Sequence, residues 1–172
     1  MPKILTIGSV LALALAFASI ASAAVISPSY QAVGFEIGAP QGDVSPFAGF
    51  ATGTTGDRAQ WRAGIAHAPL AGCTTVGSSC AVTGGTLTLT SNNGASLAGT
   101  VTGGGLTLTA QAPRCGTQTF AVVVNVTSAS GAEQFTGVLT HYRFQFRGTC
   151  TVLAATVQGT LAAVAGDDGN TF

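Results

Sequence analysis

The sequence predicts an all-β fold: an antiparallel barrel or sandwich of about eight strands, mostly joined as consecutive hairpins. Two observations predict it. Apolar and polar residues alternate with a period of two along most of the chain, and short runs rich in Gly, Asn, Pro or Ser separate these segments. We favour the barrel because a closed sheet has no exposed edge, and this chain, with 7% charged residues, has little charge to protect one.

The chain begins with a predicted secretory signal peptide. Lys3 precedes the apolar run Ile4–Ile20, and Ala21–Ala23 matches the small-residue pattern of a cleavage site. The alternative interpretation is an uncleaved membrane anchor, since the run nearly reaches the length that spans a bilayer. No second run of that length follows, so we expect no integral membrane span after cleavage. The predicted division is a signal peptide at residues 1–23, a single β domain at 24–164 and a flexible tail at 165–172.

The amino-terminal part of the domain contains two predicted strands and one ambiguous segment. Strands are expected at residues 30–37 and 47–52, with a loop at 40–46 between them. Residues 58–67 fit either a strand or a short helix capped by Asp57, and we favour the strand because the neighbouring segments have β patterns. Its two faces would then carry Arg58, Gln60 and Arg62 on one side and Ala59, Trp61, Ala63 and Ile65 on the other.

The middle of the chain predicts a three-stranded meander. Thr86–Thr90 alternates strictly, with leucines on one face and threonines on the other. Asn92–Gly94 then provides a strong hairpin signal, and residues 97–102 form the returning strand. Gly103–Gly105 is expected to turn the chain again, into a third strand at residues 106–109.

The last three predicted strands span residues 119–127, 134–147 and 151–164. We expect the aromatic face of the second of these strands to be its core side. The residues expected to share a face are Phe120, Val122, Val124 and Val126 in the first strand, Tyr142, Phe144 and Phe146 in the second, and Leu153, Val157 and Leu161 in the third.

Four cysteines predict two disulfides, because an even number in an exported domain is typical of a disulfide framework. Cys73 and Cys80 would form a local clip. Cys115 precedes one of the consecutive strands and Cys150 follows the next, so both would lie at the same end of the sheet within bridging reach. The spacings do not match a zinc site, and no metal is expected.

Composition and motifs argue against several functions. Six basic residues balance six acidic ones, so no positive field is available to hold nucleic acid. The phosphate-binding loop, the dinucleotide-binding glycine motif, the zinc-protease motif and the EF-hand loop are all absent, so no cofactor is expected. A hydrolase with scattered residues remains an alternative. Glu36 and Glu133 are the kind of carboxylate pair that a glycosidase would bring together.

The best candidate site is a polar stripe on the predicted strand at 134–147. Its members lie at alternate positions and share a face, where imidazole and guanidinium groups would bind a ligand or a partner. They are His141, Arg143, Gln145 and Arg147. The alternative interpretation is an ordinary solvent face. A second candidate is a ligand mouth lined by Trp61, Phe47 and Phe50, for which core packing is the alternative.

Two resemblances bear on function. The threonines of the meander resemble, over one short stretch, the T-x-T arrays of ice-binding solenoid proteins, and the Gly/Ala/Thr-rich, disulfide-bearing composition is similar to that of fimbrial subunits. The sequence predicts an exported, non-enzymatic binding module of the cell envelope or extracellular space, with a small molecule or a protein as partner. The alternatives are a surface or appendage subunit that assembles through strand edges, an outer-membrane barrel, and the hydrolase. The threonines of the array are Thr86, Thr88, Thr90, Thr100, Thr102, Thr107 and Thr109.

Overall fold

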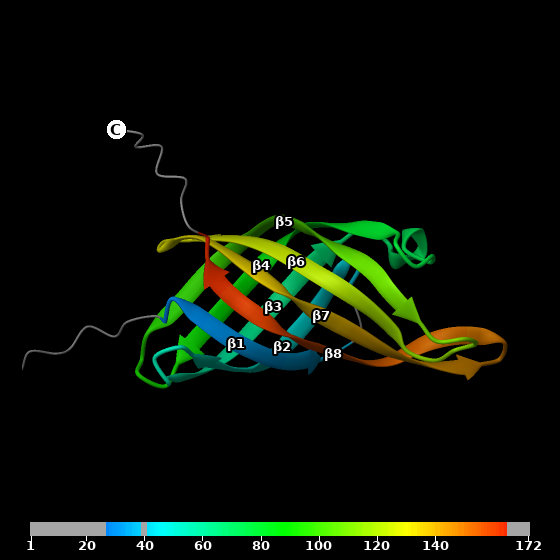
Figure 1. Cartoon of the computed structure of the whole chain (residues 1–172), viewed down its shortest axis with the longest axis horizontal. Coiled ribbons are helices and arrows are strands. Elements are labelled where there is room, and N and C mark those ends of the chain that lie inside the picture. The colour runs from blue at the N-terminus through cyan, green and yellow to red at the C-terminus, as the bar shows by residue number, and fades with distance from the viewer. Residues whose placement is uncertain (1–26, 39–40, 165–172) are drawn as a thin grey trace, which may run out of the picture.

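A computed structural model gives the fold of residues 27–38 and 41–164. Eight antiparallel strands follow one another as hairpins, and the last pairs with the first to close a barrel (Figure 1). The all-β prediction is confirmed, and the barrel is the correct form of it. The predicted signal peptide and tail lie outside the described residues. The strands are β1 (Ser29–Glu36), β2 (Val44–Gly53), β3 (Arg58–His67), β4 (Ser79–Ser91), β5 (Ser96–Gln111), β6 (Gln118–Ser128), β7 (Gly131–Phe146) and β8 (Thr149–Ala163).

The barrel wall alternates between residues that face the interior and residues that face outward. The leucines of β4 face inward and its threonines face solvent, as predicted. In β6 the predicted inner face is also correct, since the residues between its buried members are exposed. Because the sheet closes on itself, all inward side chains contribute to one interior. The buried residues of β6 are Phe120, Val122, Val124 and Val126.

The segment at 58–67 is a strand, which confirms the favoured interpretation. Its Trp61 points into the barrel, and the indole Nε1 donates to the carbonyl oxygens of Val33 and Phe50, at 3.2 Å each. The ring occupies space left by Gly34 of β1 and Gly49 of β2, where a Cβ atom would collide with it. Inward glycines therefore allow the wall to hold a buried tryptophan whose only polar group is satisfied.

β5 differs from the prediction because it is one long strand. The segment Gly103–Gly105 does not turn the chain. It lies within β5, where the pairing with β6 shifts register between Val101 and Gly103. Gly103 and Gly104 have φ of 154° and 137°, values that side-chain-bearing residues rarely adopt. Glycine thus allows a bulge that bends the strand without ending it.

Two smaller corrections concern β2 and β8. β2 begins at Val44, so the predicted loop ends earlier than expected. In β8, Leu153 is 70% exposed and does not share the buried face of Leu161. The pairing with β7 shifts register at this point, because Tyr142 pairs with Ala154 and the next residue, Arg143, pairs with Val152. Leu153 is therefore the extra, unpaired residue of a bulge.

β7 presents its faces in the opposite sense to the prediction, which was wrong. Tyr142, Phe144 and Phe146 are 46%, 55% and 59% exposed, whereas His141 is 6% exposed. The body of the strand decides its orientation, because Leu139 lies on the same face as His141 and packs in the core. β6 pairs with β7 only as far as His141, and the β7–β8 hairpin projects beyond the wall (Figure 1).

Both predicted disulfides are confirmed as pairs. Cys73 and Cys80 have Cα atoms 5.8 Å apart and join the 3₁₀ turn Leu70–Gly72 to the start of β4. Cys115 and Cys150, with Cα atoms 5.3 Å apart, join the β5–β6 loop to the β7–β8 hairpin. Two disulfides are consistent with an oxidising, exported environment.

The two ends of the barrel carry different connections. One end, which we name the floor, carries the β2–β3, β4–β5 and β6–β7 turns. The opposite end, which we name the mouth, carries the β1–β2, β3–β4 and β5–β6 connections and the β7–β8 hairpin. Both disulfides lie at the mouth.

Candidate ligand-binding cavity

The barrel encloses an apolar cavity that extends from Tyr30 near the floor to His67 and His141 near the mouth. All eight strands contribute to its lining, which is aliphatic and aromatic apart from Tyr30, Ser45, His67 and His141. The cavity volume is about 90 Å³. It is smaller than the roughly 150 Å³ of an engineered apolar cavity that holds benzene.

The floor is closed by hydroxyl groups that converge on the carboxylate of Asp57. Tyr30 Oη donates to Oδ2 at 2.6 Å, Ser91 Oγ donates to Oδ2 at 2.8 Å and Thr55 Oγ1 donates to Oδ1 at 2.7 Å. Ser27 Oγ also donates to Oδ1. These bonds, that of Ser27 foremost, hold the pKa of Asp57 well below its usual range, while burial raises the pKa of Tyr30. The cluster is saturated with hydrogen bonds and leaves no unpaired group for a ligand.

The mouth contains a second, smaller polar cluster, formed by His67 and Ser45. His67 Nδ1 lies 2.9 Å from the carbonyl oxygen of Ala68, which only accepts, so Nδ1 carries the proton. In the neutral ring Nε2 is then an acceptor, and Ser45 Oγ donates to it at 3.3 Å. This pair fixes the tautomer of His67 at the edge of the cavity.

His141 lies deeper in the barrel wall and is incompletely satisfied. Its ring packs against that of Phe120 in a T-shaped arrangement with centroids 5.3 Å apart, and its Nδ1 is buried with no hydrogen-bond partner in the described structure. Burial, followed by the charges of the nearby His67 and Arg143, lowers the pKa of His141 to about 4. The ring is therefore neutral at pH 7. An unpaired buried nitrogen costs about 1–3 kcal/mol.

The other members of the predicted stripe do not form one site with His141. Arg143 is half-buried, and its Nε donates to the carbonyl oxygen of Gly116 at 3.0 Å. Its Nη2 is buried without a hydrogen-bond partner in the described structure. Gln145 and Arg147 are exposed on the projecting hairpin. His141 therefore lines the cavity instead of facing solvent, whereas Gln145 and Arg147 face solvent.

Two of the three aromatic residues predicted to line a ligand mouth do face the cavity. Trp61 and Phe47 line the cavity, but Phe50 is 61% exposed on the outer wall. Three positions separate Phe47 from Phe50, and residues an odd number apart in a strand face opposite sides. Sequence reasoning missed Ser45 and His67. The available signal was that His67 lies an even number of residues after Trp61 and so shares its inward face.

The remaining candidates lie apart. Glu36 ends β1 at the mouth and Glu133 begins β7 near the floor, so they do not form a carboxylate pair. Glu133 is buried; its Oε1 accepts hydrogen bonds from Ser128 and Ser130, and its Oε2 has no hydrogen-bond partner in the described structure. The threonines of the meander lie on the outer wall of β4 and β5. Within residues 27–38 and 41–164, no three His, Cys, Asp or Glu side chains gather as metal ligands would.

In the same residues, no helix has the length and apolar character needed to cross a membrane. The chain was compared with family models, with curated proteins and with solved structures. None of the three comparisons finds a match, so any function has to be argued from the geometry itself.

Proposed function

We propose that the protein is an exported binding module that holds a small, largely apolar molecule inside the barrel. One observation carries this proposal: the buried, unpartnered Nδ1 of His141 at the mouth end of an apolar cavity. Buried polar groups in proteins are nearly always hydrogen-bonded, so an unpaired one marks a position that a ligand atom would complete. The two disulfides support the exported setting.

The chemistry of the cavity narrows the ligand class. An ion would lose its hydration among apolar walls without gaining a counter-charge, because His141 is neutral at pH 7. The ligand is therefore uncharged, with a hydroxyl or carbonyl group against His141 and hydrocarbon against Trp61 and Leu139. The volume of about 90 Å³ restricts it to roughly the size of a small ring.

Two alternatives fit the geometry less well. Each strand in the barrel wall pairs on both sides, so assembly by strand addition is limited to the short β7–β8 hairpin beyond the wall. A water-filled transmembrane pore is polar inside, whereas this interior is apolar. The outer wall is mixed, with threonines on β4 and β5 and exposed Val33, Phe35 and Phe50 on β1 and β2. Both arguments favour a ligand-binding barrel over an appendage subunit or a membrane pore.

Trp61 provides a direct test. It lines the cavity and is the only tryptophan of the chain, so its fluorescence reports on the interior. We would titrate the oxidised protein with cyclic alcohols and ketones of increasing ring size. We expect a saturable change in Trp61 emission and a rise in Tm for the smallest members, and no response once the ring exceeds the cavity.

Matched variants locate the ligand. Ala63→Leu adds bulk inside the cavity and should abolish binding, whereas Ala98→Leu makes the same change on the outer face of β5 and should not. His141→Leu should weaken binding of the alcohol about tenfold while leaving the parent hydrocarbon unaffected. The proposal fails if no compound in the series alters Trp61 emission, or if Ala63→Leu binds as tightly as the wild type.

A further inference from the structure

The β7–β8 hairpin forms a projection at the mouth. β6 pairs with β7 as far as His141 and β1 pairs with β8 only from Thr156, so the hairpin beyond these points has no neighbouring strand. The Cys115–Cys150 disulfide and the hydrogen bond from Arg143 to Gly116 attach it to the β5–β6 loop. We name this unit, residues 142–155 with the loop at 112–117, the tip.

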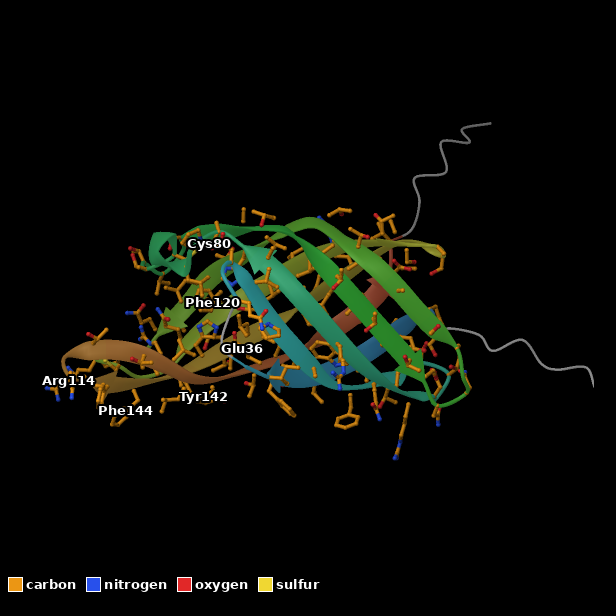
Figure 2. All side chains as sticks on the ribbon, turned by 180° about the vertical axis from the view of Figure 1, so that it is seen from behind. Glu36, Cys80, Arg114, Phe120, Tyr142 and Phe144 are labelled. Atoms are coloured by element: carbon orange, nitrogen blue, oxygen red, sulfur yellow. A yellow bond between two sulfur atoms is a disulfide. The ribbon has the colours of Figure 1, made fainter. Side chains whose placement is uncertain are left out.

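One face of the tip is apolar and open to solvent. Figure 2 shows Tyr142 and Phe144 pointing away from the barrel, and Phe146 and Leu153 are also largely exposed. An outer groove of about 360 Å³ adjoins this surface along β8; it reaches Tyr142 and has a mixed lining that includes Thr140 and Gln158. Exposed apolar side chains gathered in this way mark a docking region.

The tip is also positively charged. Arg114, Arg143 and Arg147 belong to it, and neither residues 112–117 nor residues 142–155 include Asp or Glu. The Arg147 guanidinium lies over the Phe146 ring, 5.2 Å from its centroid, and Arg114 lies at the far end of the projection (Figure 2). The acidic residues of the described mouth, Glu36 and Asp43, lie instead on β1 and its connection to β2.

We infer that the tip docks on an anionic lipid surface, with the rings of Phe144 and Phe146 among the headgroups and Arg114 and Arg147 on phosphates. Charge complementarity favours this occupant, because aromatic rings and arginines together match the membrane interface, where rings lie at headgroup depth and cations meet anionic lipid. This inference goes beyond the cavity ligand and does not depend on it. Docking by the tip would bring the mouth of the barrel to the lipid surface.

Vesicle co-sedimentation tests the inference. The oxidised protein would be mixed with vesicles of phosphatidylcholine alone, or of phosphatidylcholine with 30 mol% phosphatidylglycerol as the anionic lipid (roughly 1 in 3 lipids). We expect binding to the anionic vesicles, weakened several-fold when the salt concentration rises from about 0.02 to about 0.5 M. Phe144→Ser with Phe146→Ser should weaken binding on the order of tenfold or more. Arg114→Gln with Arg147→Gln should weaken it several-fold and flatten its salt dependence.

Matched controls separate the tip from the barrel wall. Phe50→Ser removes a ring that is equally exposed on β2, and Arg62→Gln removes an exposed charge on β3; neither should change vesicle binding. Near-UV circular dichroism checks each fold, and the single variants Phe144→Ser and Phe146→Ser serve if the double variant misfolds. Absence of binding to anionic vesicles overturns the inference, as does equal loss in Phe50→Ser. A dimer in solution that the Phe144/Phe146 variants dissociate, without vesicle binding, would overturn it in favour of a protein interface.

Discussion

The polar groups at the floor of the barrel and those at its mouth differ in how fully they are hydrogen-bonded. At the floor, hydroxyl groups satisfy the carboxylate of Asp57. At the mouth, Nδ1 of His141 and Nη2 of Arg143 are buried without partners, and two disulfides hold the surrounding loops. A polar cluster that is saturated contributes stability, whereas one left incomplete has the capacity to bind. Under the proposed function, the Asp57 cluster has a structural role and the mouth end binds the ligand; the floor also holds one buried oxygen without a partner in the described structure, Oε2 of Glu133.

The disulfides at the mouth should give the largest effect. Cys115→Ser with Cys150→Ser removes a crosslink across 35 positions and should lower the free energy of unfolding by about 4 kcal/mol in the chain-entropy model. Cys73→Ser with Cys80→Ser opens a loop of only 7 positions and should cost about 2 kcal/mol. Urea unfolding followed by circular dichroism measures both. A larger loss from the short loop would show that native-state contacts outweigh loop entropy.

Asp57→Ala tests the floor. It leaves the buried hydroxyls of Tyr30, Ser27 and Ser91 without their acceptor, so we expect a loss of about 3 kcal/mol in the free energy of unfolding. Asp43→Ala removes an exposed carboxylate at the mouth and should cost less than about 0.5 kcal/mol. Equal effects of the two substitutions would remove the distinction between the ends.

Acid should affect the two ends in separate pH ranges. The folded pKa of His141, about 4, lies below the ordinary value of 6.5, so between these values the unfolded chain binds more protons. Stability is then complete above pH 6.5 and falls by about 3 kcal/mol as the pH drops to 4. His67 and Arg143 oppose protonation in the same direction. The Asp57 contribution disappears only below its ordinary pKa of 3.8.

The variant His141→Leu checks this assignment. It should remove the decline between pH 6.5 and 4 and leave the decline at lower pH in place. At pH 7 its stability should match or exceed that of the wild type, because the unpaired nitrogen is gone. Chemical denaturation at closely spaced pH values measures the two curves. An unchanged decline between pH 6.5 and 4 would assign the titration to another group.

Periodicity predicted the fold because a strand that runs without interruption keeps one set of residues inside. It failed where an extra residue reverses that order, at Thr102 in β5 and at Leu153 in β8. It also failed for β7, because the aromatic side chains of Tyr142 and Phe144 suggested a core face. That inference assumed that the whole strand lies in the wall, and the hairpin extends beyond it.

The candidate site was predictable only in part, because closure of the barrel assembles it. His141 was identified from its own strand, but His67 and Ser45 reach the same cavity from β3 and β2. No local pattern records which strands face each other across a closed interior. The cysteine pairing was predictable because consecutive hairpins return the chain to the same end, a rule that needs only strand order.

Substitutions that remove one hydroxyl group at each end should give the smallest differences in stability. Ser91→Ala removes one of the donors to Asp57 and should cost about 1 kcal/mol, since the remaining hydroxyls still satisfy the carboxylate. Ser45→Ala removes the donor to His67 Nε2 and should cost less, because a mouth that admits a ligand also admits a water molecule to replace the hydroxyl. Urea unfolding at pH 7 ranks the two variants. A greater loss in Ser45→Ala than in Ser91→Ala would mean that water does not reach His67, and the path by which a ligand enters the barrel would then have to lie elsewhere.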